Sequence, residues 1–361
     1  MEDKKFKATI KQHYVYRKYL SSWTPEKSTT GMIQCYRKEE KKIFSPTLMG
    51  IGQSRYFYEF HSLTEIEKMM VVLMTQSKQK IVKEANPLFL LKKISDIDEL
   101  EKAHNFFKNG KVNIKNLGKY LNDYDPETYK SLKRQTGEEM QKIYESSGLI
   151  YLDKLTKGNV NFLHDKSDVI KFISYFVMQY IRTNYMRDRQ AQLFSSMGKD
   201  HENLLQYIPF CQNELNLAEI PFDSKKAIEE IKKTDENLDF KKIHPYTLMS
   251  HTTQLSYALS IQHKPTLHIL ESVENINFIT GDQPILNIYF DPSSQKEPSD
   301  VAFYYPLSPK YALIIDFKGN KYEKECSSEQ VLMYNQKIIN LALSQIYSID
   351  AADFRINGIV D

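Results

Sequence analysis

The side chains best suited to catalysis lie in two short polar segments near opposite ends of the chain. His13 lies in the segment 11–14, and Asp282 follows the strand-like run 278–280 in a Gly-Asp-Gln-Pro turn. Histidine titrates nearest to neutral pH, so it commonly acts as a general acid or base. An aspartate at the end of a buried strand can orient an imidazole or hold a cation, and it can equally cap its own turn. His13 and Asp282 are therefore candidate catalytic residues.

A polar stripe follows the apolar half of a long helix expected over residues 166–197. That half is apolar on nearly all sides, which predicts a buried helix. Gln179, Arg182 and Thr183 come next, three and four residues apart, so they share one helix face. The planar guanidinium of Arg182 suits phosphate or carboxylate, and a buried charge needs a partner. Two interpretations are open: an anion clamp for a substrate, or an internal arginine–carboxylate pair that fixes packing.

Together these residues suggest a hydrolase of phosphodiester or nucleotide substrates, with nuclease-like chemistry. His13 would act as the acid or base, Asp282 as its orienter or a metal ligand, and Arg182 as the phosphate clamp. A divalent metal is a candidate cofactor, although the sequence names no ligand set for it. The candidate substrate-binding side chains are Gln12, Tyr14, Gln179, Arg182 and Gln283.

The same polar groups also allow a function of another class. A non-catalytic module that senses a ligand, a nucleotide or a nucleic acid, for example in a phage-defence or toxin system, would use them for recognition or for packing. The two classes differ in whether the His13 and Asp282 side chains line one open pocket or are buried and fully paired. The sequence alone leaves open whether the protein is an enzyme, and it does not set the oligomeric state.

Composition and charge exclude several classes of protein. The 361 residues carry 49 Lys and Arg against 46 Asp and Glu, a net charge of +3, which does not imply a strongly cationic nucleic-acid-binding surface. The three widely spaced cysteines build no zinc site or disulfide framework and favour a reducing cytosol. Glycine-rich phosphate loops are absent. We expect a cytoplasmic protein, because no apolar run reaches the ~20 residues of a membrane span and the start does not resemble a signal peptide.

The pattern of elements predicts an α+β fold. Residues 1–60 favour strands and loops, including a hairpin within 31–46, and residues 62–263 are largely helical, beginning with a capping-box signature at Ser62 and Glu65. We expect one compact domain over 1–361, a helical middle section packed on a mostly antiparallel sheet that the strands of 264–361 and the N-terminal hairpin form together. The C-terminal strands are expected at 266–270, 277–280, 285–289, 301–305 and 311–316, followed by a last helix over 327–347.

Several of these segments resemble one bacterial family, the domain of unknown function 4238. Residues 12–20 resemble its QHYVPxxYL opening, residues 278–284 its FITSDNP motif, and residues 179–183 and 306–309 its QxxRT helix and PLSP turn. The chain departs from these patterns at Tyr16, Gly281 and Gln283, where the family usually has Pro, Ser and Asn. The resemblance spans nearly the whole chain and implies a bacterial soluble α+β protein. It carries over no reaction.

Overall fold

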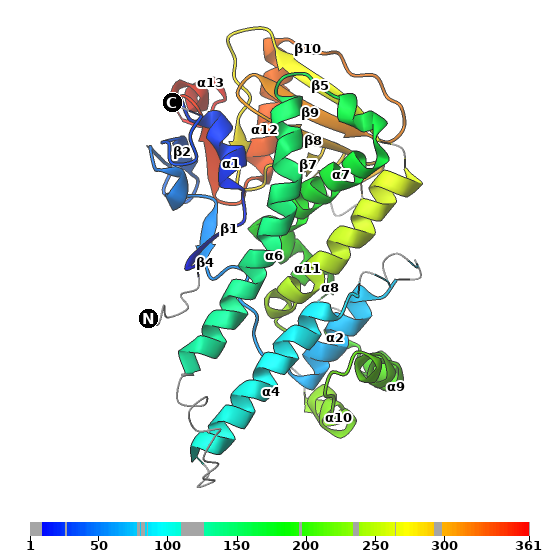
Figure 1. Ribbon diagram of the computed structural model, residues 1–361. Coiled ribbons are helices and arrows are strands. Elements are labelled where there is room, and N and C mark those ends of the chain that lie inside the picture. The colour runs from blue at the N-terminus through cyan, green and yellow to red at the C-terminus, as the bar shows by residue number, and fades with distance from the viewer. Residues whose placement is uncertain are drawn as a thin grey trace. The chain divides into compact units, whose positions relative to one another are not determined.

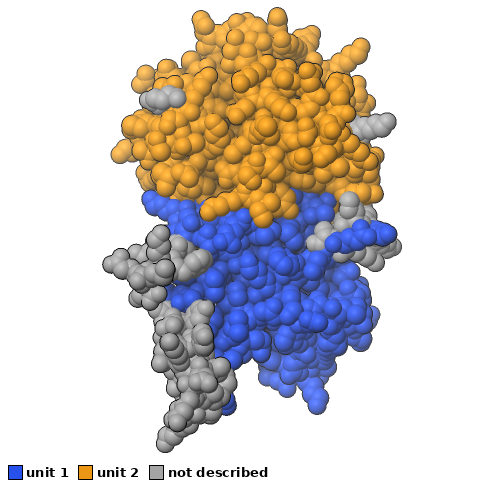
Figure 2. Space-filling model, in the orientation of Figure 1, with its two compact units in different colours: residues 1–12, 58–141, 188–253 blue, residues 13–57, 142–187, 254–361 orange. Residues whose placement is uncertain are grey.

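The computed structural model describes residues 9–25, 27–77, 80, 84, 86–109, 126–194, 197–233, 238–263, 265–291 and 298–360 (Figure 1). The chain forms two compact units (Figure 2). Unit 1 comprises residues 1–12, 58–141 and 188–253, and unit 2 comprises residues 13–57, 142–187 and 254–361. The expectation of a single domain over 1–361 stays a prediction.

Unit 1 is helical, as the pattern of residues 62–263 predicts. Its helix α2 (Glu65–Thr75) buries Ile66, Met69 and Met70 in an apolar core, to which Leu204 and Ile243 also belong. The other helices with residues in this unit are α4 (Phe89–Asn109), α6 (Pro126–Leu155), α8 (Asn184–Phe194), η4 (Met197–Lys199), α9 (His201–Leu217), α10 (Ser224–Lys233) and α11 (Phe240–Tyr257).

The start of α2 differs from the expected capping box. Thr64 is the N-cap residue: its hydroxyl oxygen accepts the N–H of Glu67 at 3.3 Å, and the Glu67 carboxylate accepts the N–H of Thr64 at 2.9 Å. Ser62 instead donates its hydroxyl to Asp98, and Glu65 binds a lysine. The prediction was wrong by two residues, because Ser62/Glu65 and Thr64/Glu67 are overlapping signatures of the same kind.

Unit 2 contains a five-stranded sheet in the order β10-β5-β9-β8-β7. Its neighbouring strands are antiparallel, except that β10 runs parallel to β5. This arrangement and the helical middle of the chain confirm the α+β class, and the C-terminal strands run from yellow to orange in Figure 1. The strands are β5 (Thr266–Ser272), β7 (Leu286–Asn287), β8 (Ala302–Pro306), β9 (Tyr311–Asp316) and β10 (Glu325–Cys326).

A second, four-stranded antiparallel sheet contains the N-terminal hairpin. Its order is β3-β2-β11-β6, so the hairpin pairs with β11 and the strands are divided between two sheets where the sequence predicts one. The last helix, α12 (Ser328–Leu341), ends six residues before the expected position, and β11 occupies the remainder. The strands are β2 (Gln34–Arg37), β3 (Lys42–Phe44), β6 (Thr280–Gly281) and β11 (Gln345–Ser348).

The shorter elements connect these sheets and helices. They are β1 (Lys11–His13), α1 (Arg17–Leu20), η1 (Ser21–Trp23), η2 (Leu48–Gly50), β4 (Gln53–Arg55), η3 (Asn161–His164), η5 (Ala258–Gln262) and α13 (Ala352–Ile356).

The helix expected over 166–197 is interrupted. The structure has α7 (Lys166–Ile181) and α8, separated at Arg182 and Thr183. The Thr183 hydroxyl oxygen accepts the N–H of Met186 at 3.3 Å, which satisfies one of the free donors at the start of α8. The apolar half forms α7, and Phe172, Phe176 and Val177 are all 0 % exposed. The buried helix is confirmed, whereas its single continuous length was wrong.

Aromatic side chains fill the space between α7 and the five-stranded sheet. The Phe176 ring lies 5.4 Å from that of Phe303 and 5.9 Å from that of Tyr305 in edge-on geometry. Trp23, the only tryptophan of the chain, is also buried in unit 2. Its indole N–H donates to the carbonyl of Phe278 at 3.1 Å, and its ring lies 5.0 Å from that of Tyr19.

Phe176→Ala should lower the free energy of unfolding by about 3–5 kcal/mol, because it removes a fully buried ring and leaves a cavity. Ile170→Ala is the matched control on the same helix, since Ile170 is 37 % exposed, and it should cost about 1 kcal/mol or less. Urea-induced unfolding measures both. Equal losses for the two variants would show that α7 is not the buried helix of its unit.

Candidate functional site

Gln179 and Arg182 hold the backbone of the segment 13–16. The Gln179 side-chain carbonyl accepts the N–H of Tyr16 at 3.2 Å, and its amide donates to the Tyr14 carbonyl at 3.2 Å. The Arg182 guanidinium donates from Nε to the same carbonyl at 3.0 Å and from Nη2 to the carbonyl of His13. Both side chains are 1 % exposed or less. These two groups, expected to bind substrate, fix the opening segment onto the end of α7.

The Arg182 guanidinium also stacks on an aromatic ring. Its central carbon lies 3.8 Å from the centre of the Tyr16 ring, and Tyr16 stacks in turn on Tyr175 at 5.2 Å. The delocalised, weakly hydrated charge of arginine suits such a dry environment. These contacts favour the interpretation that Arg182 fixes internal packing. The partners seen here are two backbone carbonyls and an aromatic ring, whereas the sequence suggests a carboxylate.

Asp282 fixes the loop between α12 and β11. Its carboxylate accepts the backbone N–H groups of Leu343, Ser344 and Gln345 at 2.8, 2.7 and 3.0 Å, together with the Ser344 hydroxyl at 2.7 Å. The side chain is 3 % exposed. Burial raises the pKa of Asp282, against the opposing effect of these hydrogen bonds. The carboxylate thus ends α12 and starts β11, the strand that the sequence analysis missed.

Gln283, the next residue, ties the same turn to the break between α7 and α8. Its side-chain amide donates to the Ile285 carbonyl at 2.7 Å, and its side-chain carbonyl accepts the hydroxyl of Thr183. Gln283 and Thr183 are both fully buried. The polar stripe after α7 and the Gly-Asp-Gln-Pro turn therefore meet within unit 2, as side chains that bind protein atoms.

The other predicted residues have different surroundings. The His13 ring is half-buried, and its Nε2 lies 3.2 Å from the carbonyl oxygen of Leu48. Burial raises the pKa of Tyr14, and the negative charge of Asp282 adds to the shift, so these two groups lie near each other. Gln12 belongs to unit 1, where its amide binds the carbonyl of Arg134 and the N–H of Tyr58. Arg182 reaches the backbone of His13, while the Asp282 carboxylate bonds to residues 343–345.

Glu145 on α6 is a candidate that the sequence analysis did not name. It lies half-buried in unit 2, and no hydrogen bond or ion pair holds its carboxylate among the described residues. Burial raises the pKa of this carboxyl, and the positive charges of Arg182, Arg17 and Lys142 oppose the shift in that order. A partly accessible carboxyl with a raised pKa beside cations is typical of acid–base sites.

The position of Glu145 depends on close contact between α6 and α7. At Gly148, a Cβ atom would lie only 2.0 Å from Cγ of Tyr175 on α7, so the two helices come together where one of them has no side chain. Glu145 is less than one turn away from this contact. A lone glycine inside a helical pattern was the available sequence signal, since it commonly marks close packing.

A groove of about 490 Å³ lies in unit 2 and is called the lysine groove. Four lysines and one aspartate, Asp153, line it, so its charged side chains sum to +3. Lys310 forms an ion pair with Glu271 at 3.0 Å, whereas Lys18, Lys27 and Lys157 have no carboxylate partner among the described residues. The lysines are Lys18, Lys27, Lys157 and Lys310, and the hydroxyl groups come from Ser21, Ser22, Thr156, Ser308 and Tyr311.

Glu145 lies close to one end of the lysine groove. Leu149 and Leu152 line the groove and follow Glu145 by four and seven residues on α6, so these three residues share one helix face. Leu149 is about one helical turn, roughly 5.4 Å, from Glu145 along the axis. Arg17, which acts on Glu145, directly precedes Lys18, which lines the groove. The Glu145 carboxyl therefore lies next to the lysine groove.

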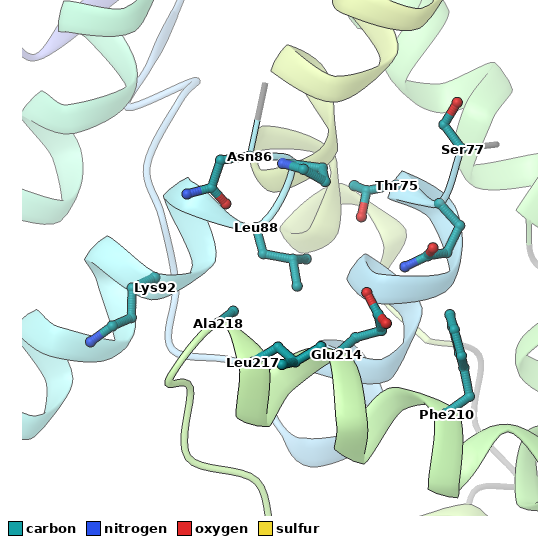
Figure 3. A pocket seen from close by; sticks show the side chains of 11 residues that line it. Thr75, Ser77, Asn86, Leu88, Lys92, Phe210, Glu214, Leu217 and Ala218 are labelled. Carbon is teal, nitrogen blue, oxygen red and sulfur yellow. The ribbon is translucent and has the colours of Figure 1, made fainter. Parts of the chain in front are cut away.

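Unit 1 has two grooves of its own. One, of about 390 Å³, lies between α9, which contributes Phe210, Glu214 and Leu217, and the start of α4, which contributes Lys92 (Figure 3). Leu88, which directly precedes α4, also lines this groove (Figure 3). This groove has one acid and one base among its lining residues, so its charges balance.

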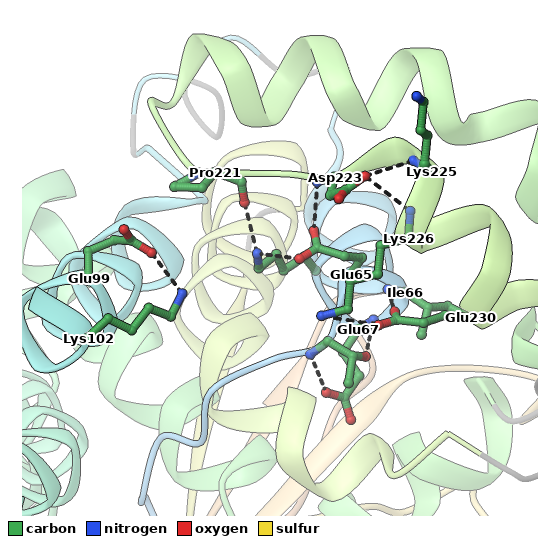
Figure 4. Close-up of polar contacts among 12 residues, drawn as sticks. Glu65, Ile66, Glu67, Glu99, Lys102, Pro221, Asp223, Lys225, Lys226 and Glu230 are labelled. Carbon is green, nitrogen blue, oxygen red and sulfur yellow. Dashed lines mark hydrogen bonds and ion pairs between the residues drawn. The ribbon is translucent and has the colours of Figure 1, made fainter. Parts of the chain in front are cut away.

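The second groove of unit 1, of about 560 Å³, is rich in charged groups that bind one another. Lys68 binds the Glu65 carboxylate at 3.0 Å and the Pro221 carbonyl at 2.8 Å, and Lys102 binds Glu99 at 2.9 Å (Figure 4). The Asp223 carboxylate accepts the N–H groups that begin α10. Because these charges are neutralised inside the unit, this groove has less need of an ionic ligand than the lysine groove.

Two further properties bear on the kind of site. No group of three or more His, Cys, Asp and Glu side chains within the described part of the chain is arranged to hold a metal ion. None of the described helices is long and apolar enough to cross a membrane.

Comparison with known proteins places the chain in a family. The family model described as protein of unknown function (DUF4238) matches residues 11–352 of the 361. The chain therefore belongs to this family, and the resemblance of its motifs is confirmed. No curated protein and no solved structure matches the chain.

Asp282→Ala should destabilise the protein by about 2–4 kcal/mol, because three backbone N–H groups and one hydroxyl lose their acceptor in a buried place. Glu323→Ala, an exposed carboxylate of the same unit, is the control and should change stability by about 0.5 kcal/mol or less. Thermal or urea unfolding measures both. If Asp282→Ala unfolds like wild type, Asp282 is not the anchor of β11, and its catalytic interpretation gains ground.

Glu145→Gln should make the protein more stable near neutral pH. A carboxyl whose folded pKa is raised stabilises the folded state below its unfolded pKa of about 4.3, and this contribution is lost as the pH rises through the folded pKa. Glutamine cannot ionise, so the variant escapes that loss, and its advantage should vanish near about pH 4. Urea unfolding at the two pH values tests this, with the exposed Glu139→Gln on the same helix as control. A variant less stable than wild type at neutral pH would contradict the raised pKa.

Proposed function

We propose that this protein hydrolyses phosphodiester bonds, with the lysine groove binding the substrate and Glu145 and His13 acting as its acid–base pair. The observation that carries the proposal is Glu145: a half-buried carboxyl with a raised pKa and no hydrogen bond among the described residues, one helical turn from a groove of net positive charge. The His13 role follows the sequence-based hypothesis, and Glu145 takes the place that it gave to Asp282. The groove lysines replace Arg182 as the phosphate clamp, because Arg182 is buried and donates to the His13 and Tyr14 carbonyls.

The chemistry requires one group that takes a proton and one that gives a proton. Water attacks the phosphorus, the Glu145 carboxylate accepts the water proton, and the P–O bond to the leaving alcohol breaks. His13, in its protonated form, donates its proton to the leaving oxygen. A carboxyl with a raised pKa and an imidazole both have pKa values nearer to neutral pH than an ordinary carboxyl has. Such groups can both accept and donate a proton at neutral pH. Arg182, which binds the His13 carbonyl and is the strongest charge acting on Glu145, links the two groups.

The lysine groove supports an anionic substrate. Its volume of about 490 Å³ lies within the usual range for small-ligand sites, roughly 300–1,000 Å³. Its lysines without carboxylate partners repel one another until an anion neutralises them, and each lysine–phosphate contact releases a bound counterion. A phosphodiester or nucleotide supplies such an anion. Action on nucleic acid inside a cell would fit a cytoplasmic defence or toxin effector, which we include in the proposal.

A non-catalytic sensor is the second candidate. It is favoured by the packing of Gln179, Arg182 and Asp282, whose polar atoms bind protein groups. In this case the lysine groove alone would carry the function, and the segment around His13 would serve as scaffold.

Glu145→Gln should reduce hydrolysis of a fluorescent single-stranded oligonucleotide by about 100- to 10,000-fold, the range for loss of a general acid or base, with unchanged binding. Lys157→Gln should instead weaken binding and reduce its dependence on salt. The control variants are Glu139→Gln and Lys233→Gln, two exposed positions on α6 and α10.

The outcomes separate the two functions. Hydrolysis lost in Glu145→Gln and kept in Glu139→Gln supports the hydrolase. Wild-type protein that binds the oligonucleotide through Lys157 but does not cleave it, with or without divalent metal, supports the sensor. If Lys157→Gln changes neither oligonucleotide binding nor hydrolysis, the lysine groove is excluded from both functions.

A further inference from the structure

The lysine groove continues into a second groove of unit 2. This one has a volume of about 450 Å³ and shares two lining residues, Lys157 and Tyr311, with the lysine groove. Because both residues line both grooves, the two spaces adjoin. We call the second one the tyrosine groove, after Tyr311 and Tyr322 in its lining.

Aromatic rings form part of the tyrosine groove and are held in place. The rings of Tyr322 and His268 lie 5.0 Å apart. The Tyr322 hydroxyl donates to Asp316 at 3.4 Å, and the Tyr311 hydroxyl donates to Glu271 at 3.4 Å. With their hydroxyls tied to carboxylates on the sheet, both rings keep a fixed direction and need little ordering when a ligand binds. Both tyrosines are only half-buried, so ring surface remains accessible.

Cationic groups are distributed along both grooves. Lys18 lines the lysine groove alone, Lys157 lines both, and Lys324 lines the tyrosine groove alone. Lys324 also forms an exposed ion pair with Glu271 at 3.8 Å. These lysines place positive charge in each groove and at the residues that the two grooves share. A single phosphate can reach one of these lysines, whereas a polymer of phosphates can reach all three.

We propose that the two grooves together bind a short single-stranded oligonucleotide, with backbone phosphates beside Lys18, Lys157 and Lys324 and one base stacked against Tyr322. This rests on the proposed function, since it names the substrate class of the same site. A cationic groove that follows the backbone, combined with aromatic rings for the bases, is how single strands are bound without sequence preference. Bases in a duplex are stacked on each other and do not offer a free face to a tyrosine. A mononucleotide can fill only one of the two grooves.

The experiment measures dissociation constants for thymidine monophosphate and for oligothymidylates of two, four and six nucleotides. We expect affinity to rise from the mononucleotide to the tetranucleotide and then to level off. Oligouridylates of the same lengths form a parallel arm that distinguishes DNA from RNA as the source of the strand. Equal affinity for the mononucleotide and the tetranucleotide in both arms would overturn the proposal.

Variants of Tyr322 test the stacking itself. Tyr322→Leu should weaken tetranucleotide binding by about 5- to 150-fold, the effect of losing one base–aromatic stack, and leave binding of the monophosphate unchanged. Tyr322→Phe keeps the ring but loses the hydroxyl bond to Asp316. It should therefore bind much closer to wild type than Tyr322→Leu does, which also shows that the position tolerates substitution. Tyr207→Leu, at an exposed tyrosine of unit 1, is the matched control. A wild-type affinity of Tyr322→Leu for the tetranucleotide would contradict the proposal.

The proposed function and this inference fail in different ways. Binding that depends on length and on Tyr322, without cleavage of any strand, supports the inference and rejects the hydrolase. Cleavage that depends on Glu145, with affinity independent of length and of Tyr322, supports the hydrolase and rejects the inference.

Discussion

The attachment of the segment 13–16 to the end of α7 is the interaction on which unit 2 depends. Taking a guanidinium out of water is costly unless its donors find acceptors, and Arg182 finds them on the backbone carbonyls of His13 and Tyr14. Every residue has a backbone carbonyl that can accept a hydrogen bond. Two of them can bind one guanidinium only where the segment 13–16 is held in the correct position beside α7. This attachment sets where the His13 ring lies, and it brings a positive charge beside Glu145.

The sequence was sufficient to find the important segments but not what their side chains bind. The types and spacing of Gln179 and Arg182 predicted a polar face after a buried helix, and the structure has one. Their partners are backbone atoms of residues some 165 positions earlier, and backbone acceptors leave no trace in residue types. For the same reason the sequence predicts a catalytic Asp282, whereas the Asp282 carboxylate accepts the N–H groups of residues 343–345.

The predicted boundaries of helices and strands were wrong where a tertiary contact, and not the local sequence, ends the element. Neither Arg182 nor Thr183 is a helix-breaking residue type, so the pattern gave no reason to divide the helix there. Residues 342–347 continue the apolar composition of α12, and tertiary contacts place them in a loop and β11 instead: the buried Asp282 carboxylate and the pairing with β2 and β6. Glu145 illustrates the same limit for function, because its raised pKa follows from burial in the folded chain, which residue types do not reveal. Likewise, the net charge of the whole chain, +3, does not indicate that one groove is lined by four lysines and a single acid.

The burial of Trp23 has a consequence for optical spectroscopy. As the chain's only tryptophan, it makes unit 2 the sole source of indole emission, because unit 1 contains no tryptophan. A ring that is 0 % exposed emits from an apolar environment and shifts its emission to longer wavelength when water reaches it. Tryptophan fluorescence therefore reports the state of unit 2 alone, while far-ultraviolet circular dichroism, dominated by helices, records both units. Denaturation curves from the two signals coincide if the units unfold together and separate if they do not.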